Sequence, residues 1–200
     1  LTRMRLRAEL VDDEALRAQI NADIDDMQAM VDATLDYLRG LGESEAPQSI
    51  DIEALLASLV ADEQALDRAV DFGGGRCPPY SGRVSALKRA IANLIDNAVK
   101  YGHAAHLSVA DTPDTLRIVV EDDGPGIPPA DLERVVEPYV RLETSRSRET
   151  GGVGLGLAVA RGAARLHGGE LLLEKRAEGG LRATLMLPRL PATRQKQDHS

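Results

Sequence analysis

The sequence has few aromatic residues and a single cysteine. Aromatic residues make up 2% of the 200 residues, with one phenylalanine and no tryptophan, so a core must be built mainly from leucine, valine, isoleucine and alanine. Cys77 alone cannot form an intramolecular disulfide, which fits a reducing cytoplasm and a structural rather than catalytic thiol. Hydrophobic residues still make up 43% of the chain, enough for one ordinary domain with a smaller appended element.

The chain also lacks a long apolar run and an excess of basic charge. It has no stretch of about 18 apolar residues and does not begin like a signal peptide, so we expect the residues given to be soluble and cytoplasmic. The formal net charge of -8 argues against nucleic acid as a partner, because phosphate backbones bind basic surfaces. A nucleotide, which needs only a few local cations, is not excluded.

Residues 1–41 predict a partial helical hairpin. The second helix has apolar residues at three- and four-residue steps, namely Ile20, Ile24, Met27, Val31 and Leu38. Gly40 is a suitable stop for this helix, and Leu1 to about Leu10 reads as the end of a preceding one. A hairpin this short cannot bury its apolar stripe alone, so it should pair with a second chain or another segment.

Residues 51–190 mix helices and short strands, between an expected linker at 42–50 and an expected disordered tail at 191–200. Helices are predicted at 51–66, 81–101, 129–136 and 154–167. Strands are predicted on both sides of Gly73-Gly74-Gly75, at 106–110 and 116–121, and as a hairpin at 171–175 and 181–187. This order predicts an α+β fold, a two-layer α/β sandwich with a mixed sheet, rather than a doubly wound parallel sheet.

The predicted helix ending at Tyr101 has an unusual polar stripe. Asn93, Asn97 and Lys100 are spaced by four and three residues, which places them on one face. Because asparagine is a mediocre helix former, two in one stripe need a reason. The stripe is either a solvated face or a row of amide oxygens that ligate Mg²⁺, with a lysine one turn further on for phosphate.

A glycine-rich loop follows the strand that ends at Glu121, with the sequence Asp122-Asp123-Gly124-Pro125-Gly126-Ile127. Its glycines let the backbone approach another group closely. An ionised carboxylate only accepts hydrogen bonds, so Asp122 would accept one from the adenine amine and repel the guanine oxygen. The alternative is an ordinary acidic turn.

A second glycine-rich loop, Gly151 to Leu157, opens directly into a helix. Glycine backbone amides and a helix N-terminus favour an anion, so this loop is similar to a phosphate cradle. It matches neither a Walker loop nor a dinucleotide fingerprint. The preceding loop carries Arg141, Arg146 and Arg148, which could bind phosphate oxygens or belong to a flexible, solvated surface loop.

The order of these motifs resembles that of the bacterial two-component sensor histidine kinases. Asn93-Leu-Ile-Asp-Asn97, Asp122-x-Gly124-x-Gly126, Glu137-Pro138-Tyr139-x-Arg141 and Gly152-x-Gly154-Leu155-Gly156-Leu157 are similar to the N, G1, F and G2 boxes of that family. His167-Gly168-Gly169 also matches the family, and Asp23 to Leu38 is similar to the second helix of its dimerisation hairpin. The resemblance implies the Bergerat (GHKL) α/β sandwich shared with gyrase, MutL and heat-shock chaperone ATPases.

The resemblance also implies roles for individual residues. Asn93 and Asn97 would hold Mg²⁺, Lys100 would lie at phosphate, Tyr101 at the base, and Asp122 would bind the adenine amine. Residues 128–152 would form a lid over ATP. The implied nucleotide contacts further include Gly124, Gly126, Ile127, Tyr139, Arg141, Arg148, Gly152, Val153, Gly154, Leu155, Gly156, Leu157 and Thr184. Two residues depart from the family pattern. Tyr139 stands where phenylalanine is usual, and its extra hydroxyl should be tolerable at a lid anchor. Asp123 stands where asparagine is commoner, and there we expect little consequence.

The implied activity is that of an ATP-dependent protein histidine kinase. In the family the γ-phosphoryl passes to a histidine on the first hairpin helix and then to an aspartate of a response regulator. None of the histidines here, His103, His106, His167 and His199, lies in such a stretch. We therefore expect a chain that holds the ATP site, lacks the acceptor and does not autophosphorylate.

The implied partners are a cognate response regulator and a second copy, joined through a hairpin weakened by truncation. A parent protein would be anchored in the bacterial inner membrane by a sensor region. One alternative is an ATP-driven clamp of the chaperone or mismatch-repair type, but those proteins typically have a glutamate base where Asn93 stands. Another is a non-catalytic dimerisation and regulator-docking module with a vestigial nucleotide site.

Overall fold

The computed structural model describes residues 6, 9, 13–42, 45–142 and 153–189. The expected tail at 191–200 and most of the expected first hairpin helix lie outside this range. In chain order the elements are α2 (Glu14–Gly42), β1 (Gln48–Ile50), α3 (Ile52–Gln64), β2 (Ala69–Phe72), β3 (Tyr80–Gly82), α4 (Val84–Gly102), β4 (Ala104–Asp111), β5 (Thr115–Glu121), the 3-10 helix η1 (Pro129–Asp131), α5 (Gly156–Leu166), β6 (Glu170–Lys175) and β7 (Leu181–Pro188).

The main sheet has five strands in the order β2-β4-β5-β7-β6. The β2–β4 pair is parallel and the other three pairs are antiparallel, so the predicted mixed sheet is confirmed. In register, Leu185 of β7 lies between Ile118 of β5 and Leu171 of β6. All three side chains belong to the buried core, which fixes the face of the sheet that the helices cover.

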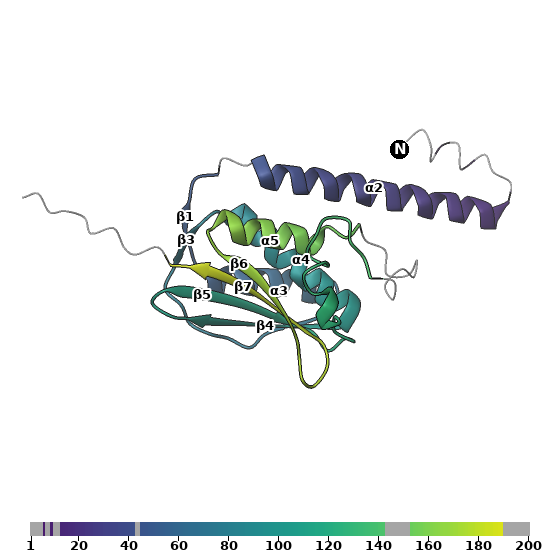
Figure 1. The fold of residues 1–200 in the computed structure, drawn as a ribbon. Helices are drawn as coiled ribbons and strands as arrows, with labels where there is room; N and C mark the ends of the chain where they lie inside the picture. The colour runs from purple at the N-terminus through teal and green to yellow at the C-terminus, as the bar shows by residue number, and fades with distance from the viewer. Residues whose placement is uncertain (1–5, 7–8, 10–12, 43–44, 143–152, 190–200) are drawn as a thin grey trace, which may run out of the picture.

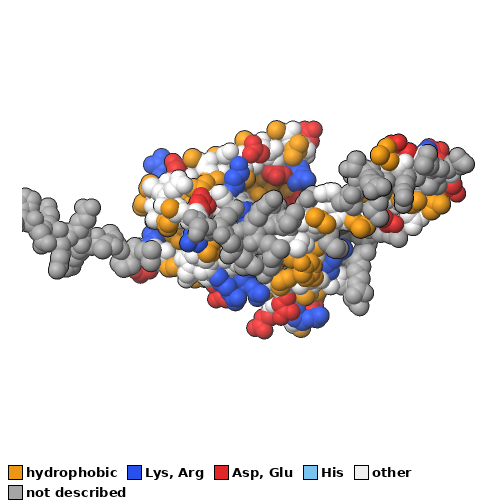
Figure 2. Space-filling model, turned by 90° about the horizontal axis from the view of Figure 1, so that it is seen from above, with side chains coloured by type: hydrophobic (Ala, Val, Ile, Leu, Met, Phe, Trp, Pro, Cys, Tyr) orange, Lys and Arg blue, Asp and Glu red, His pale blue; other side chains and the backbone are white. Residues whose placement is uncertain are grey.

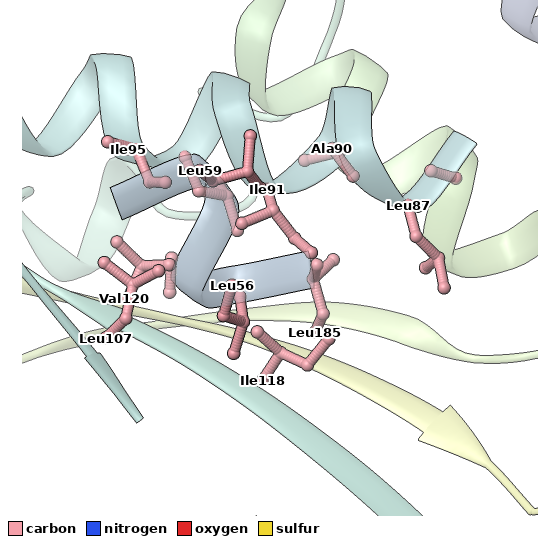
Figure 3. Packing of buried hydrophobic residues seen from close by; sticks show 14 of the residues in the cluster. Leu56, Leu59, Leu87, Ala90, Ile91, Ile95, Leu107, Ile118, Val120 and Leu185 are labelled. Carbon is pink, nitrogen blue, oxygen red and sulfur yellow. The ribbon is translucent and has the colours of Figure 1, made fainter. Parts of the chain in front are cut away.

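Helices α3, α4 and α5 lie on one face of the sheet, which gives the two predicted layers (Figure 1). Figure 3 shows leucines of α3 and the apolar face of α4 pointing at β4, β5 and β7. Leu56, Ile91, Ile118 and Leu185 are each 0% exposed. As the composition indicates, this core is aliphatic. Burial of this much aliphatic surface is the main force that holds α4 on the sheet.

Helix boundaries follow local chemistry where a side chain caps them. The carboxylate of Asp51 accepts a hydrogen bond from Ala54 N at 3.0 Å, so α3 begins where the sequence predicts. In contrast, α4 begins at Val84 rather than at Ser81, because Ser81 and Gly82 pair with β1 in a small second sheet. The predicted helix at 129–136 is only the 3-10 turn η1 followed by further turns, since several of its hydrogen bonds reach three residues back.

The expected linker at 42–50 is wrong at its C-terminal end. Residues Gln48–Ile50 form β1, which pairs with β3, and Ile50 is 5% exposed within the core. The polar composition around Pro47 hid a strand of only three residues, whose pairing partner is far away in the sequence. The unit formed by the two sheets and their helices therefore begins at about residue 48.

Two side chains from other elements hold the N-terminus of α4. The Glu45 carboxylate accepts from Ser85 N at 3.1 Å, and its backbone carbonyl accepts from Arg83 Nε at 2.8 Å. His167, which follows α5, accepts from Arg83 N through Nε2 at 2.9 Å and donates through Nδ1 to the Ala163 carbonyl at 2.7 Å. These contacts fix α4 against both α5 and the segment that follows α2.

Helix α2 runs across α5 and extends beyond the sandwich (Figure 1). Ile24 of its predicted stripe is 3% exposed, but Met27 is 48% and Val31 47% exposed. Figure 2 shows hydrophobic side chains at the surface of the part of α2 that projects from the sandwich. Within the described part of the chain, no helix has the length and apolar character that crossing a membrane requires.

Candidate functional site

The two asparagines of α4 face the beginning of α5. Asn93 Nδ2 donates to the Arg89 carbonyl of its own helix at 2.9 Å, which turns its Oδ1 outward. A Cβ built on Gly156 would lie 3.1 Å from that Oδ1 and 3.4 Å from Asn97 Nδ2. Both amides therefore lie against the first residue of α5, and a side chain at Gly156 would occupy the space in front of them.

Among the described residues, no side chain caps the N-terminus of α5 with a hydrogen bond. The residue at the cap position, Leu155, is apolar and 3% exposed. The first turn of a helix has unpaired backbone N–H groups and a partial positive charge. Since the asparagine amides lie beside this turn, the region can bind an anion together with a cation.

The segment before the second glycine-rich loop is attached to that loop by its backbone. Tyr139 N donates to the Gly154 carbonyl at 2.9 Å, and a Cβ on Gly154 would lie 2.8 Å from the Val140 carbonyl. Tyr139 has φ of 65°, a left-handed conformation that is uncommon for tyrosine, and its side chain is 55% exposed. The attachment is therefore made by main-chain groups of Tyr139 rather than by a buried ring.

Lys100 and Arg141 supply positive charge close to the asparagines. Burial lowers the pKa of Lys100, Asp96 opposes that shift, and the Arg141 guanidinium lowers the pKa further, so the two cations lie close enough to repel each other. Lys100 Nζ also lies 5.6 Å from the centroid of the Tyr101 ring. A polyanion bound beside Lys100 would raise its pKa again.

Asp122 lies at the end of β5 and is 7% exposed. Its Oδ1 accepts hydrogen bonds from Gly124 N at 2.9 Å and from Leu181 N at 3.2 Å. Burial raises the pKa of the Asp122 carboxyl, while these two bonds and the nearby Arg176 guanidinium oppose the shift. Within the described structure the carboxylate receives its bonds through Oδ1, which leaves Oδ2 to accept a donor from a ligand.

Asp122 lies beside the C-terminal end of α4. A Cβ on Gly102 would be 2.5 Å from Asp122 Cβ, and one on Gly124 would be 2.6 Å from the Tyr101 carbonyl. Asn93 lies nine residues before Gly102, which is about 14 Å along the helix axis at the usual rise. The site is therefore an extended one, with a buried carboxylate at the C-terminal end of α4, Lys100 in the last turn of that helix, and the two amide side chains further back beside the N-terminus of α5.

The structure brings together most, but not all, of the residues that the sequence indicates. Arg148 and Gly152 lie outside the described residues. Leu157 packs against the core, and Ile127 and Val153 are partly buried. Thr184 is not brought to the site: it lies between the core residues Ala183 and Leu185 on β7 and opposite Val119, so it faces away from the helices.

The sequence interpretation missed an ionic network around Asp123. Asp123 Oδ2 lies 3.2 Å from His106 Nε2, and its Oδ1 accepts from Arg176 Nη1 at 2.7 Å. His106 Nδ1 lies 2.5 Å from the Asp71 carboxylate. The expectation that aspartate at position 123 has little consequence did not consider these contacts and stays a prediction. No local signal predicts the network, because its members are placed by strand pairing, such as that of Asp71 with His106.

His106 must carry both ring protons to make these contacts. Each ring nitrogen faces a carboxylate, and a carboxylate only accepts hydrogen bonds, so both nitrogens must be donors. The hydrogen bond with Asp71 raises the pKa of His106, burial opposes this shift, and the hydrogen bond with Asp123 adds to it. Arg176 and His106 in turn lower the pKa of Asp123.

The part of the chain that forms this mixed sheet and its helices matches the sequence pattern of one ATPase family. The family described as histidine kinase-, DNA gyrase B- and HSP90-like ATPase matches residues 82–191. The chain belongs to this family, and its ATP-binding unit is of the sensor histidine kinase kind. The sensor histidine kinase GtrS of Pseudomonas aeruginosa is 43% identical over 190 residues, 95% of this chain and 39% of GtrS.

Other relatives and solved structures agree. The sensor protein RstB of Escherichia coli strain K12 is 34% identical over 94% of this chain and 45% of its own length. The ATP-binding domain of PrrB from Mycobacterium tuberculosis has a TM-score of 0.59 at 28% identity, covering 74% of this chain and 100% of that one. The histidine kinase domain of the E. coli osmosensor EnvZ has a TM-score of 0.58 at 30% identity, covering 80% and 98%. The chain thus spans less than half the length of GtrS and RstB.

Proposed function

We propose that this chain binds Mg-ATP along α4 and acts as the ATP-binding catalytic part of a protein histidine kinase. The observation that carries the proposal is the placement of Asp122 at one end of α4 and of Asn93 and Asn97, against Gly156, further back. A nucleoside triphosphate can span this distance, with its adenine at Asp122 and its phosphates at the α5 N-terminus. Lys100 and Arg141 then neutralise phosphate charge, which is the main task of a protein in phosphoryl transfer.

The asparagine pair fits a magnesium ion that is shared with phosphates. Mg²⁺ prefers oxygen ligands and usually keeps waters or substrate phosphates in its coordination shell. The described residues contain no group of three or more His, Cys, Asp or Glu side chains that could hold a metal alone. Amide oxygens of Asn93 and Asn97 would supply the protein ligands. When bound, the ion would neutralise charge on the β- and γ-phosphates.

We propose that the phosphoryl acceptor is none of the histidines that the structure describes. His103 ends α4 with φ of 63°, His106 is held between two carboxylates, and both ring nitrogens of His167 are hydrogen-bonded. The acceptor would be a histidine on a dimerisation hairpin that includes α2. From it the phosphoryl group would pass to an aspartate of a response regulator.

The partners and location that we propose follow from the same role. Met27 and Val31, exposed on α2, would pack against the hairpin of a second copy. A longer parent protein would hold this ATP-binding part on the cytoplasmic side of a bacterial inner membrane.

Calorimetric titration with ATP, with and without Mg²⁺, tests the site. The chain should bind ATP more tightly with Mg²⁺, and Asn97→Ala should remove most of that gain, about tenfold for one lost charge-assisted ligand. Asn21→Ala on α2 is the matched control and should bind like the parent. An ATP affinity that does not depend on Mg²⁺ would contradict the proposal, as would an Asn97 variant that behaves like the control.

Phosphate incorporation tests the transfer. The chain alone should take up no acid-labile phosphate from ATP, because a correctly placed acceptor supplies proximity worth several kcal/mol of barrier. A longer chain that also carries an acceptor helix should incorporate phosphate, and mutation of that histidine should abolish it. Stable phosphohistidine at His103, His106 or His167 would contradict this assignment.

A further inference from the structure

We propose that Arg176 is a positioning residue that sets the selectivity for adenine by holding Asp122, an inference that rests on the proposed nucleotide site. Arg176 comes from the turn between β6 and β7, outside every motif that the sequence indicates. Its side chain contacts the acidic loop that follows β5 and Glu121 at the end of that strand.

The β6–β7 turn encloses Asp122. Asp122 N donates to the Leu181 carbonyl at 3.0 Å, and Leu181 N donates to Asp122 Oδ1 at 3.2 Å. Gly180 has φ of 87°, and a Cβ there would lie 1.8 Å from the Asp122 carbonyl oxygen. Only glycine allows this approach, which shows that the turn is built against the backbone of Asp122.

Arg176 completes this enclosure at the carbonyl. Its Nη1 donates to the Asp122 carbonyl at 2.5 Å and to Asp123 Oδ1 at 2.7 Å, and its Nε lies 3.5 Å from Glu121 Oε1. The Arg176 side chain is 20% exposed. Because one guanidinium nitrogen bridges two consecutive residues, it fixes the peptide between Asp122 and Asp123. That peptide leads to the Gly124 N–H, a donor to the Asp122 carboxylate.

The guanidinium is itself held by a chain of charges that crosses the sheet. Asp123, which anchors it, is paired with His106 of β4, and His106 is paired with Asp71 of β2. From β5, Glu121 faces both Arg176 and Arg182 of β7. These partners fix the position of Arg176 relative to three strands, whereas a lone surface arginine would have no such fixed position.

The consequence for a ligand concerns charge and orientation. Burial disfavours the ionised form of the Asp122 carboxyl and raises its pKa, whereas the Arg176 charge lowers that pKa. Arg176 therefore favours a carboxylate that is ionised and points its free Oδ2 away from the turn. An ionised, oriented Asp122 accepts a hydrogen bond from the exocyclic amine of adenine, and a tilted or protonated one discriminates less well.

The test compares ATP with purine riboside triphosphate, which lacks the exocyclic amine. In the parent chain, ATP should bind about tenfold more tightly than this analogue. Arg176→Met should weaken ATP binding by about fivefold and leave the affinity for the analogue unchanged, because Arg176 acts on the contact with the exocyclic amine. Arg176→Lys should recover part of the loss, because a single nitrogen makes both contacts. The control Arg182→Met, which loses a 2.7 Å bond to Glu121 but no contact with Asp122, should bind both ligands as the parent does.

The outcomes separate this inference from the proposed function. If Asp122→Ala leaves the ratio of the two affinities unchanged, the proposed base contact is wrong and Arg176 has nothing to position. If Asp122→Ala makes the two affinities equal but Arg176→Met leaves their ratio unchanged, only the role of Arg176 is overturned. An equal loss for both ligands in Arg176→Met, with no recovery in Arg176→Lys, also overturns it, because that pattern is structural damage.

Discussion

The C-terminal end of α4 and its middle carry the two halves of the site, and they are built differently. At the C-terminal end, the protein itself supplies partners for the Asp122 carboxylate, its amide and its carbonyl. In the middle, the asparagines lie against an α5 N-terminus that no side chain caps among the described residues. Lys100, in the last turn of α4, has a pKa that burial lowers and that the Arg141 charge lowers further. Under the proposed function, the base end would therefore be complete before a nucleotide arrives, whereas the phosphate end would gain further partners from the nucleotide.

The largest expected effect is at the base end. Asp122→Ala should weaken ATP binding by about 1.5–3 kcal/mol, tenfold or more, because it removes a buried charge-assisted hydrogen bond. GTP affinity should change little, and adenosine should lose as much as ATP. Isothermal titration with the three ligands measures this, with the exposed Asp114→Ala as control. A parent chain that binds ATP and GTP equally would contradict the difference between the two ends.

Substitution at the phosphate end should give the opposite pattern. Lys100→Met keeps the alkyl chain but removes the charge, so ATP affinity should fall about fivefold while adenosine affinity is unchanged. The loss should shrink at high salt, because Lys100 is only partly buried and salt screens part of its attraction to phosphate. If adenosine binding fell as much as ATP binding, Lys100 would serve the base and the proposed direction of the nucleotide would be wrong.

Hydrogen exchange should sharpen the comparison residue by residue. The amides of Gly124 and Leu181, already bonded to Asp122, should be protected without nucleotide and gain less than about threefold on binding. The first-turn amides of α5 should gain about tenfold or more when Mg²⁺ and a non-hydrolysable ATP analogue bind. Equal gains at both ends would show that the base end is also assembled by the ligand.

The smallest effect is the pH dependence of the ionic network behind the base end. Its contacts raise the pKa of His106, so their stabilisation is present below the unfolded pKa of histidine and is lost as pH rises through the higher folded value. Because Asp123 has a lowered pKa, its contribution is lost only as pH falls through that low folded value. Melting temperature against pH should show a fall of about 2 °C across the His106 titration, absent in His106→Gln. A His106→Gln variant that keeps the full fall would assign it to another group.

Local chemistry let the sequence predict most of the architecture. The apolar stripe of α4, the cap at Asp51 and the turn between β4 and β5 lie within a few residues of the elements that they define. β1 was missed because its three residues form a strand only through β3, about 30 residues later. The same limitation applies to the start of α4. Because Ser81 and Gly82 pair with β1, the helix begins only at Val84.

Site residues could be predicted from the sequence where they stand in short motifs. They could not be predicted where strand pairing decides their position. Asn93, Asn97, Asp122 and Gly156 stand in short motifs with direct chemical meaning. Thr184 was misplaced because the direction of its side chain depends on the register of β7. Arg176 and His106 have no signal along the chain, because their significance comes from neighbours on other strands.

The hydrogen bonds that Glu45 makes at the N-terminus of α4 give the molecule a mechanical property. Glu45 stands three residues after the end of α2 and bonds to Arg83 and Ser85, so the two helices are joined by a short tether. A rotation or axial shift of α2 that moves Glu45 must either break these bonds or pull on the helix that carries the asparagines. The 29 residues of α2 then act as a lever arm, with Glu45 as its point of attachment to α4.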